Sequence, residues 1–296
     1  MITAVVVNYN AGSLLAEGVA AALPQVDELV IVDNASSDDS LAQVARRFPD
    51  DARVRIVRNR RNLGFAAACN QGAAAAAGDE VLFLNPDCVP EADAVRRLRA
   101  ALKSDPGVGM VGGLLVNPDG TEQGGARRAI PTPWRSFVRA VGLSRFDKSC
   151  PRLFFDFHLH KQPLPERPVE VEAISGACML VDRQAMADVG PWDEGYFLHC
   201  EDLDWCMRFR RKGYRIMFVP DARITHAQGT CSRARPVFVA WHKHKGMMRF
   251  YRKFFRDQYP GILMGLVAVA VWTRFALSAG YSSVRRAGHL MGIGRG

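Results

Sequence analysis

The fold is decided by the stretch Ile2-Thr3-Ala4-Val5-Val6-Val7-Asn8-Tyr9-Asn10, an apolar run that stops abruptly at polar residues. Similar short runs recur through the first 115 residues and alternate with helix-like segments. Short Val, Ile and Leu runs are typical of strands that helices cover on both faces. The pattern predicts an α/β protein with a Rossmann-like, mostly parallel central sheet flanked by helices. The expected strands are 2–7, 28–32, 54–57 and 80–84, and the expected helices are 14–23, 40–48 and 65–77.

Composition limits the class of protein. The chain has 296 residues, of which 48% are hydrophobic, so it is long enough to bury a full core. Its seven cysteines form no CxxC pair and no zinc-ligand spacing, which favours free thiols in a reducing cytosol. Because Met1 runs directly into a strand without a basic leader, we expect no export signal.

Polar side chains follow each expected strand, at the edge of a parallel sheet where ligands bind. The purely structural alternative for Asp33 is a turn residue whose side chain hydrogen-bonds to its own backbone. The structural alternative for Asn62 and Gly64 is that they begin a helix. We favour a ligand site for Asp33, and we weigh the two readings of Asn62 and Gly64 equally. The predicted ligand-facing residues are Asn8, Tyr9, Asn10, Asp33, Asn62, Gly64, Asn85 and Asp87.

Three carboxylates crowd into the four positions 201–204, directly after an apolar run. Acidic residues in a first helical turn and basic residues in the last complement the helix dipole, which is the structural alternative. That alternative explains the charge of Glu201, Asp202 and Asp204 but not their crowding, because like charges oppose one another's ionisation. We therefore predict a catalytic role for this cluster.

The second half of the chain is less regular. Periodicity fades between Gly124 and Glu170, which predicts a mobile acceptor loop, and returns at 171–181. Residues 242–256 resemble a basic amphipathic helix, within a stretch from Arg233 to Arg256 that has no acidic residue. The following apolar run, 261–273, stops at Arg274 and is shorter than the roughly 20 residues of a spanning helix. We expect this helical tail to lie on an anionic membrane surface rather than span it; the alternative is packing on the core.

Several motifs in fixed order resemble glycosyltransferase family 2, and bacterial rhamnosyltransferases in particular. The resemblance covers roughly residues 1–235 and implies a GT-A fold. It implies a nucleotide-sugar-binding half at 1–115 and an acceptor and catalytic half at 116–235, followed by the tail at 236–296. The motifs are Val5-Val6-Val7-Asn8-Tyr9-Asn10, Val32-Asp33-Asn34-Ala35-Ser36-Ser37-Asp38, Asn62-Leu63-Gly64-Phe65-Ala66, Asn85-Pro86-Asp87, Gly176-Ala177-Cys178-Met179-Leu180, Gly190-Pro191-Trp192-Asp193-Glu194, Glu201-Asp202-Leu203-Asp204 and His226.

The resemblance also implies roles for residues. Asp33 and the residues after Val7 would hold the base and ribose of the donor. Asp87 and His226 would bind Mg²⁺ or Mn²⁺ together with the donor diphosphate. The family usually carries an acid at the position of Asn85, so we expect a weaker metal site here. Asp202, assisted by Glu201, would accept the proton of the acceptor hydroxyl, and the residues expected to contact the acceptor are Trp192, Asp204 and Trp205.

The predicted function is an inverting, metal-dependent hexosyl transfer. The sugar would be L-rhamnose from dTDP-rhamnose, and the acceptor a polyprenyl-diphosphate-linked or other cell-surface glycan of cell-wall or lipopolysaccharide synthesis. The enzyme would be cytoplasmic and peripheral on the inner face of the plasma membrane. Alternatives are a UDP- or GDP-linked donor, a nucleotidyltransferase, and a basic nucleic-acid-binding protein, suggested by the net charge of +9. Because the acids at the strand ends would repel a polyanion, we expect no nucleic-acid partner; the oligomeric state is left open.

Overall fold

A computed structural model describes residues 1–147, 149–227 and 235–290, and they form two compact units. The first contains Met1–Ile130, Phe157–Phe197 and the chain from Glu201 to the gap at 228–234. The second contains Pro131–Asp156, Leu198–Cys200 and the chain after that gap. The segment Pro131–Asp156 therefore groups with the C-terminal helices, whereas the predicted division at residue 235 remains a prediction.

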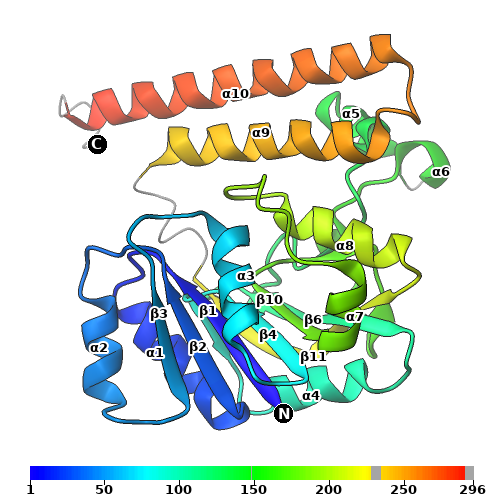
Figure 1. Ribbon diagram of the computed structural model, residues 1–296. Helices are drawn as coiled ribbons and strands as arrows, with labels where there is room; N and C mark the ends of the chain where they lie inside the picture. The colour runs from blue at the N-terminus through cyan, green and yellow to red at the C-terminus, as the bar shows by residue number, and fades with distance from the viewer. Residues whose placement is uncertain (148, 228–234, 291–296) are drawn as a thin grey trace. The chain divides into compact units, whose positions relative to one another are not determined.

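The first unit is built on a central sheet with the strand order β3-β2-β1-β4-β10-β6-β11-β5 (Figure 1), and β8 pairs with β11. The first four strands are parallel, and β10 is antiparallel to both of its neighbours. The predicted α/β class is confirmed. The strands are β1 (Ile2–Asn8), β2 (Glu28–Asp33), β3 (Val54–Arg58), β4 (Glu80–Leu84), β5 (Cys88–Pro90), β6 (Val108–Val116), β8 (Val169–Glu170), β10 (Cys178–Asp182) and β11 (Arg215–His226).

Both faces of this sheet are covered, as the continuous apolar runs predict. Successive side chains of β1 point to opposite faces. Ala4 and Val6 belong to the core that α1 and α4 complete. Val5 faces α3, where Gly72 leaves room for it: a Cβ on Gly72 would lie 2.2 Å from Val5 Cγ1. The helices of this unit are α1 (Ser13–Ala22), α2 (Ser40–Arg47), α3 (Phe65–Ala75), α4 (Ala94–Leu102), α7 (Arg183–Val189) and α8 (Glu201–Arg211).

Between β6 and β10 the chain makes a long excursion. A small ribbon of β7 (Arg127–Arg128) and β9 (Ala173–Ile174) forms its base. The backbone N–H of Ala129 donates to the carbonyl of Phe157 over 3.0 Å, which closes the neck through which 131–156 leaves and returns. The predicted loop at 124–170 is wrong in detail, because it contains helices α5 (Pro133–Ala140) and α6 (Pro151–Phe154) and the short 3₁₀ turns Leu143–Phe146 and Leu159–Lys161.

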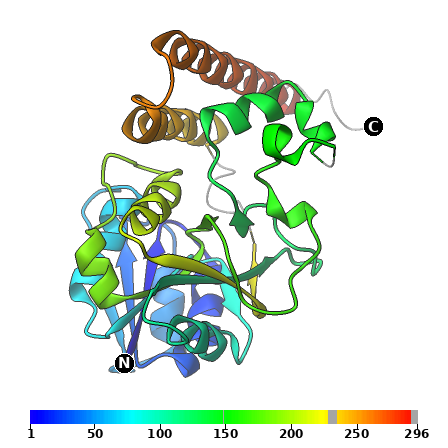
Figure 2. The ribbon, with the colours of Figure 1, turned by 90° about the vertical axis from the view of Figure 1, so that its right-hand side faces the viewer.

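The second unit contains a helical hairpin. Helices α9 (Pro236–Phe255) and α10 (Gly261–Leu290) lie side by side (Figures 1 and 2), joined by packing of Trp241 on Trp272 and Phe275. Arg274 does not end the apolar helix as the sequence argument assumed. The stretch Gly261–Tyr281 is long and apolar enough to cross a membrane by length and composition alone.

Candidate active site

Asn8 and Asp33 form a buried pair at the carboxyl ends of β1 and β2. The parallel register places Asn8 opposite Asp33. Asn8 Nδ2 donates to Asp33 Oδ1 over 2.8 Å and to Ser40 Oγ over 2.9 Å. Both side chains are buried, and Asn8 Oδ1 has no hydrogen-bond partner among the described residues. A buried acceptor without a donor is costly, so this oxygen is suited to a ligand N–H or O–H.

The two loops that follow these strands are tied together by Asn10. Its Oδ1 accepts hydrogen bonds from the backbone N–H of Ser37 (2.7 Å) and of Asp38 (3.3 Å). Asn10 adopts a left-handed φ of 54°, which asparagine tolerates better than most residues. Tyr9 beside it is half-buried. Asn10 therefore holds the two loops together at the carboxyl ends of β1 and β2.

The loop before α3 is fixed by side chains of asparagine. Asn62 Oδ1 accepts the N–H of Gly64 over 2.9 Å, and Asn34 Nδ2 donates to the Gly64 carbonyl over 3.1 Å. Gly64 has φ 89°, and a Cβ there would lie 2.7 Å from the carbonyl oxygen of Phe197. The next residue, Phe65, donates its N–H to that same oxygen over 2.8 Å. In this structure Asn62 and Gly64 hold the entry of α3 against the chain that leads to α8.

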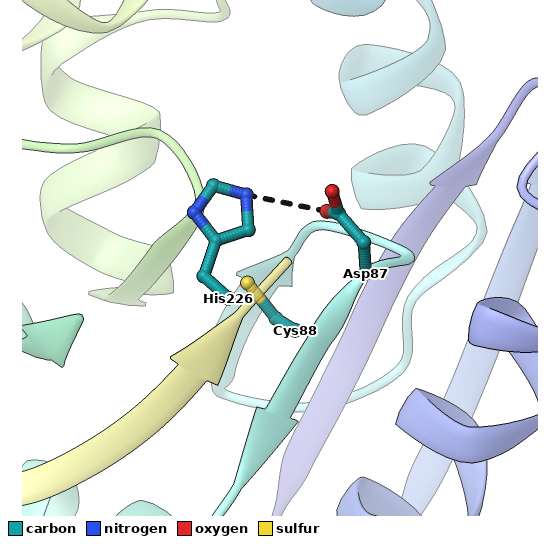
Figure 3. A group of neighbouring side chains, drawn as sticks. All are labelled: Asp87, Cys88 and His226. Atoms are coloured by element: carbon teal, nitrogen blue, oxygen red, sulfur yellow. Dashed lines mark ion pairs between the residues drawn. The ribbon is translucent and has the colours of Figure 1, made fainter. Parts of the chain in front are cut away.

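Asp87 and His226, 139 positions apart in the chain, meet at the sheet edge (Figure 3). His226 Nε2 lies 3.2 Å from Asp87 Oδ1, and both side chains are buried. The Sγ of Cys88 completes a group whose potential ligand atoms all lie within 4.8 Å of one another. The Cys88 thiol donates to the carbonyl of Ala177 over 3.4 Å, and burial raises its pKa well above its usual value. In this structure the thiol is directed toward the Ala177 carbonyl.

Gln123 orients the ring of His226. Gln123 Nε2 donates to the carbonyl of His226 (3.3 Å) and to Asn117 Oδ1 (3.1 Å), so its Oε1 faces His226 Nδ1 at 2.6 Å as an acceptor. His226 then carries its proton on Nδ1 and turns the lone pair of Nε2 toward the Asp87 carboxylate. Two acceptors at this distance are unfavourable unless a proton or a cation joins them. A carboxylate and an imidazole held by an outer hydrogen bond fit a divalent metal ion.

The acid at the second position of α8 is held from two sides. Asp202 Oδ2 accepts hydrogen bonds from a guanidinium nitrogen of Arg128 and, over 3.3 Å, from the backbone N–H of Gly176. The Asp202 side chain remains 15% exposed. It is therefore anchored and still accessible, which a general base requires. Immediately before α8, His199 and Cys200 have φ values of 69° and 71°, a strained backbone of the kind found at functional sites.

Glu201 lies in a different environment. Its side chain is buried, and Oε2 has no hydrogen-bond partner among the residues that the structure describes. Burial, reinforced by the negative charge of Asp202, raises the pKa of Glu201 to about 8. The two neighbouring carboxyls therefore have unlike surroundings: Glu201 is buried, which favours its protonated form, whereas Asp202 is ion-paired with Arg128.

The three residues expected to contact the acceptor are buried instead. Trp192 and Trp205 stack at 4.2 Å between ring centroids, and Asp204 accepts from the Tyr196 hydroxyl (3.1 Å) and from Arg208 Nε (2.8 Å). Their exposures are 2%, 0% and 0%. In this structure they fix α8 to the core, and their contact with the acceptor stays a prediction.

Two residues of this site escaped the sequence analysis. Arg128 lies within the segment interpreted as a loop, and Gln123 lies just before it. Neither belongs to one of the quoted motifs. The two consecutive arginines at 127 and 128 were the only feature of the sequence that could have drawn attention to Arg128.

This geometry can be compared with known proteins. Residues 3–190 match the family described as Glycosyl transferase family 2. The chain belongs to glycosyltransferase family 2. The relatives of this glycosyltransferase include N-acetylglucosaminyl-diphospho-decaprenol L-rhamnosyltransferase of Mycobacterium tuberculosis, which is 30% identical over 228 residues, or 73% of this chain and 72% of the relative.

Solved structures agree on the GT-A fold of this glycosyltransferase. A mannosyltransferase from Pyrobaculum calidifontis, in complex with GDP-Man and Mn²⁺, has a TM-score of 0.57 and 17% identity over 99% of this chain and 81% of its own. GalNAc-T7 with UDP, GalNAc and Mn²⁺ has a TM-score of 0.56 and 19% identity over 76% of this chain and 43% of its own. At these identities the likeness concerns the fold.

Proposed function

We propose that this glycosyltransferase moves L-rhamnose from dTDP-rhamnose, with inversion, onto a polyprenyl-diphosphate-linked glycan at the cytoplasmic face of the plasma membrane. The similarity to the mycobacterial L-rhamnosyltransferase supports the sugar and the class of acceptor. The observation that carries the proposal is the state of the two acids that begin α8. Asp202 is ion-paired with Arg128 and partly exposed, whereas its neighbour Glu201 is buried and its Oε2 has no hydrogen-bond partner among the described residues.

Inverting transfer needs one base. The acceptor hydroxyl attacks the anomeric carbon, its proton passes to a carboxylate oxygen of Asp202, and the bond to the donor diphosphate breaks on the opposite side. Arg128 and the N–H of Gly176 hold Asp202 in position for this step. Glu201 is buried, so Asp202 is the more accessible of the two acids for the acceptor hydroxyl.

The donor would occupy the edge formed by β1, β2 and β4. Asp33 and the unpartnered oxygen of Asn8 are suited to the base and ribose. Asp87 and His226 would hold Mg²⁺ or Mn²⁺, which when bound neutralises the charge of the leaving diphosphate. With a single carboxylate, most coordination positions remain for phosphate oxygens, so metal and donor should bind together.

The test is donor turnover. Purified protein, with Mg²⁺ or Mn²⁺, is incubated with a panel of dTDP-, UDP- and GDP-sugars, and release of the nucleoside diphosphate is followed with and without a polyprenyl-diphosphate glycan. We expect acceptor-dependent release from dTDP-rhamnose, reduced about a thousandfold in Asp202→Asn. Asp188→Asn, an acid in a surface ion pair, is the matched control and should retain full activity. Preference for a UDP- or GDP-sugar would overturn the proposed donor, and an active Asp202→Asn enzyme would overturn the proposed base.

A further inference from the structure

The second unit contains a cavity that the proposed chemistry does not use. Its volume is about 390 Å³, and it lies among α5, α6 and the turn between α9 and α10. Cavities of this size hold small ligands or head groups. The residues that line it are Thr132, Trp134, Arg135, Arg152, Leu153, Phe155 and Tyr259.

The lining combines positive charge with aromatic surface. The guanidinium of Arg135 lies 4.9 Å from the ring centroid of Phe155, and Arg152 is exposed. No acidic side chain is among the lining residues of the described chain. Guanidinium groups recognise phosphate oxygens through paired hydrogen bonds. The cavity is therefore matched to a phosphate group rather than to a cation or a neutral sugar.

The cavity is built on a fixed frame. The Trp134 indole N–H donates to the carbonyl of Leu153 over 2.8 Å, which joins α5 to α6. The Tyr251 hydroxyl of α9 donates to Ser136 Oγ over 2.7 Å. Arg139 contacts both carboxylate oxygens of Asp156 at 3.0 Å. These contacts hold the lining in place before any ligand arrives.

Apolar side chains are unusually exposed in the same unit. On α5 and α6 these are Trp134, Phe137 and Leu153, of which Leu153 is 56% exposed. Apolar side chains at helical spacing also form an exposed stripe on α10. Their exposed fractions range from 62% at Leu266 to 84% at Ile262, and the stripe consists of Ile262, Leu266, Val269, Leu277 and Tyr281. Contiguous exposed apolar surface marks a partner or a membrane. Together with the basic side chains of α9, it is typical of an element that lies in a lipid interface.

We propose that this cavity binds the diphosphate head group of a polyprenyl lipid, with Arg135 and Arg152 on the phosphates and the aromatic walls against the first part of the apolar chain. This inference rests on the proposed function, because its ligand is the lipid diphosphate of the proposed acceptor. Residues 131–156 then contribute a lipid-recognition site within the second unit.

The experiment measures binding to vesicles without any donor. Phosphatidylcholine vesicles that contain decaprenyl diphosphate are compared with vesicles that carry the same charge as phosphatidylglycerol. We expect tighter binding to the diphosphate vesicles, and a loss of about tenfold in that preference for Arg152→Ala and for Arg135→Ala. Arg145→Ala is the matched control, because Arg145 lies in the same segment outside the cavity and stacks on Phe146. Its preference should not change.

Two outcomes would overturn the inference: equal binding to both kinds of vesicle, or an equal loss of the preference in Arg145→Ala. Soluble inorganic pyrophosphate should compete with the diphosphate vesicles, because the proposed contacts are made to the diphosphate group. A thermal midpoint close to wild type shows that Arg135→Ala is folded, and the exposed Arg152 provides a second variant. Since no sugar transfer is measured, failure here leaves donor turnover unaffected, and an inactive Asp202→Asn enzyme should still bind the diphosphate vesicles.

Discussion

Arg128 donates a hydrogen bond to Asp202 across 74 positions of sequence, and so links the first turn of α8 to the ribbon at the base of the excursion. Replacing this arginine removes the group that positions the acid. We expect Arg128→Met to lower kcat for acceptor-dependent release about a hundredfold with little change in donor KM, since a misplaced base costs rate more than binding. Arg96→Met, an exposed arginine of α4, is the control. Full activity of Arg128→Met would contradict a positioning role.

Glu201 should make stability depend on pH. Its pKa of about 8 in the folded protein is far above its value of 4.5 in the unfolded chain. Its contribution to stability is therefore fully present below about pH 4.5 and is lost as the pH rises toward 8. Glu201→Gln should equal wild type near pH 4 and exceed it in thermal midpoint at pH 8. Glu194→Gln serves as the control, and parallel pH profiles for Glu201→Gln and wild type would refute the assignment.

Metal binding should depend on the imidazole and not on the neighbouring thiol. We expect His226→Ala to weaken Mn²⁺ binding about 10- to 100-fold, measured by calorimetry with dTDP present, and Gln123→Ala to weaken it by a similar factor through loss of ring orientation. Cys88→Ser is the matched control and should bind Mn²⁺ like wild type, because the Cys88 thiol is directed toward the Ala177 carbonyl. A large effect of Cys88→Ser would make sulfur a ligand.

Gly64 combines a left-handed backbone with a close approach, and the two can be separated. Gly120→Ala, at φ 83° with nothing within 4 Å, should cost only the backbone term of about 1–2 kcal/mol. Gly64→Ala adds a clash with the Phe197 carbonyl and should lower the free energy of unfolding clearly more. Denaturant unfolding of both variants checks this. Equal losses would mean that the chain before α8 moves freely away from α3.

The apolar stripe of α10 should control membrane association. Leu277→Glu places a charge on a side chain that is 71% exposed, and we expect it to weaken binding to anionic vesicles by about tenfold or more. Ile56→Glu, on an exposed position of β3, introduces the same charge away from the tail. Flotation of both variants with vesicles distinguishes them, and equal flotation would remove α10 as the contact.

The strands and helices of residues 1–84 could be predicted from the sequence, because strands covered on both faces have nearly continuous apolar runs. The motif order placed Asp87 and His226 near one another only by resemblance, since their meeting depends on β11 pairing with β5. Burial could not be predicted in this way. Trp192 and Trp205 resemble sugar-stacking residues in sequence, and only the packing of α8 on Phe83 shows that they belong to the core. Arg128 was missed because a two-residue strand carries no periodic signal.

The backbone hydrogen bond between Ala129 and Phe157 makes residues 131–156 a segment that can be exchanged as a unit. The two ends of this segment are held together by the sheet unit. The entropic cost of bringing the ends together therefore changes little with the length or sequence of the segment. Segments of other lengths and surfaces can therefore be exchanged at this neck while Asp202 and its partners keep their register. On the proposed function, exchanging this segment between relatives should change lipid recognition while the contacts of Asp202 with Arg128 and Gly176 stay in place.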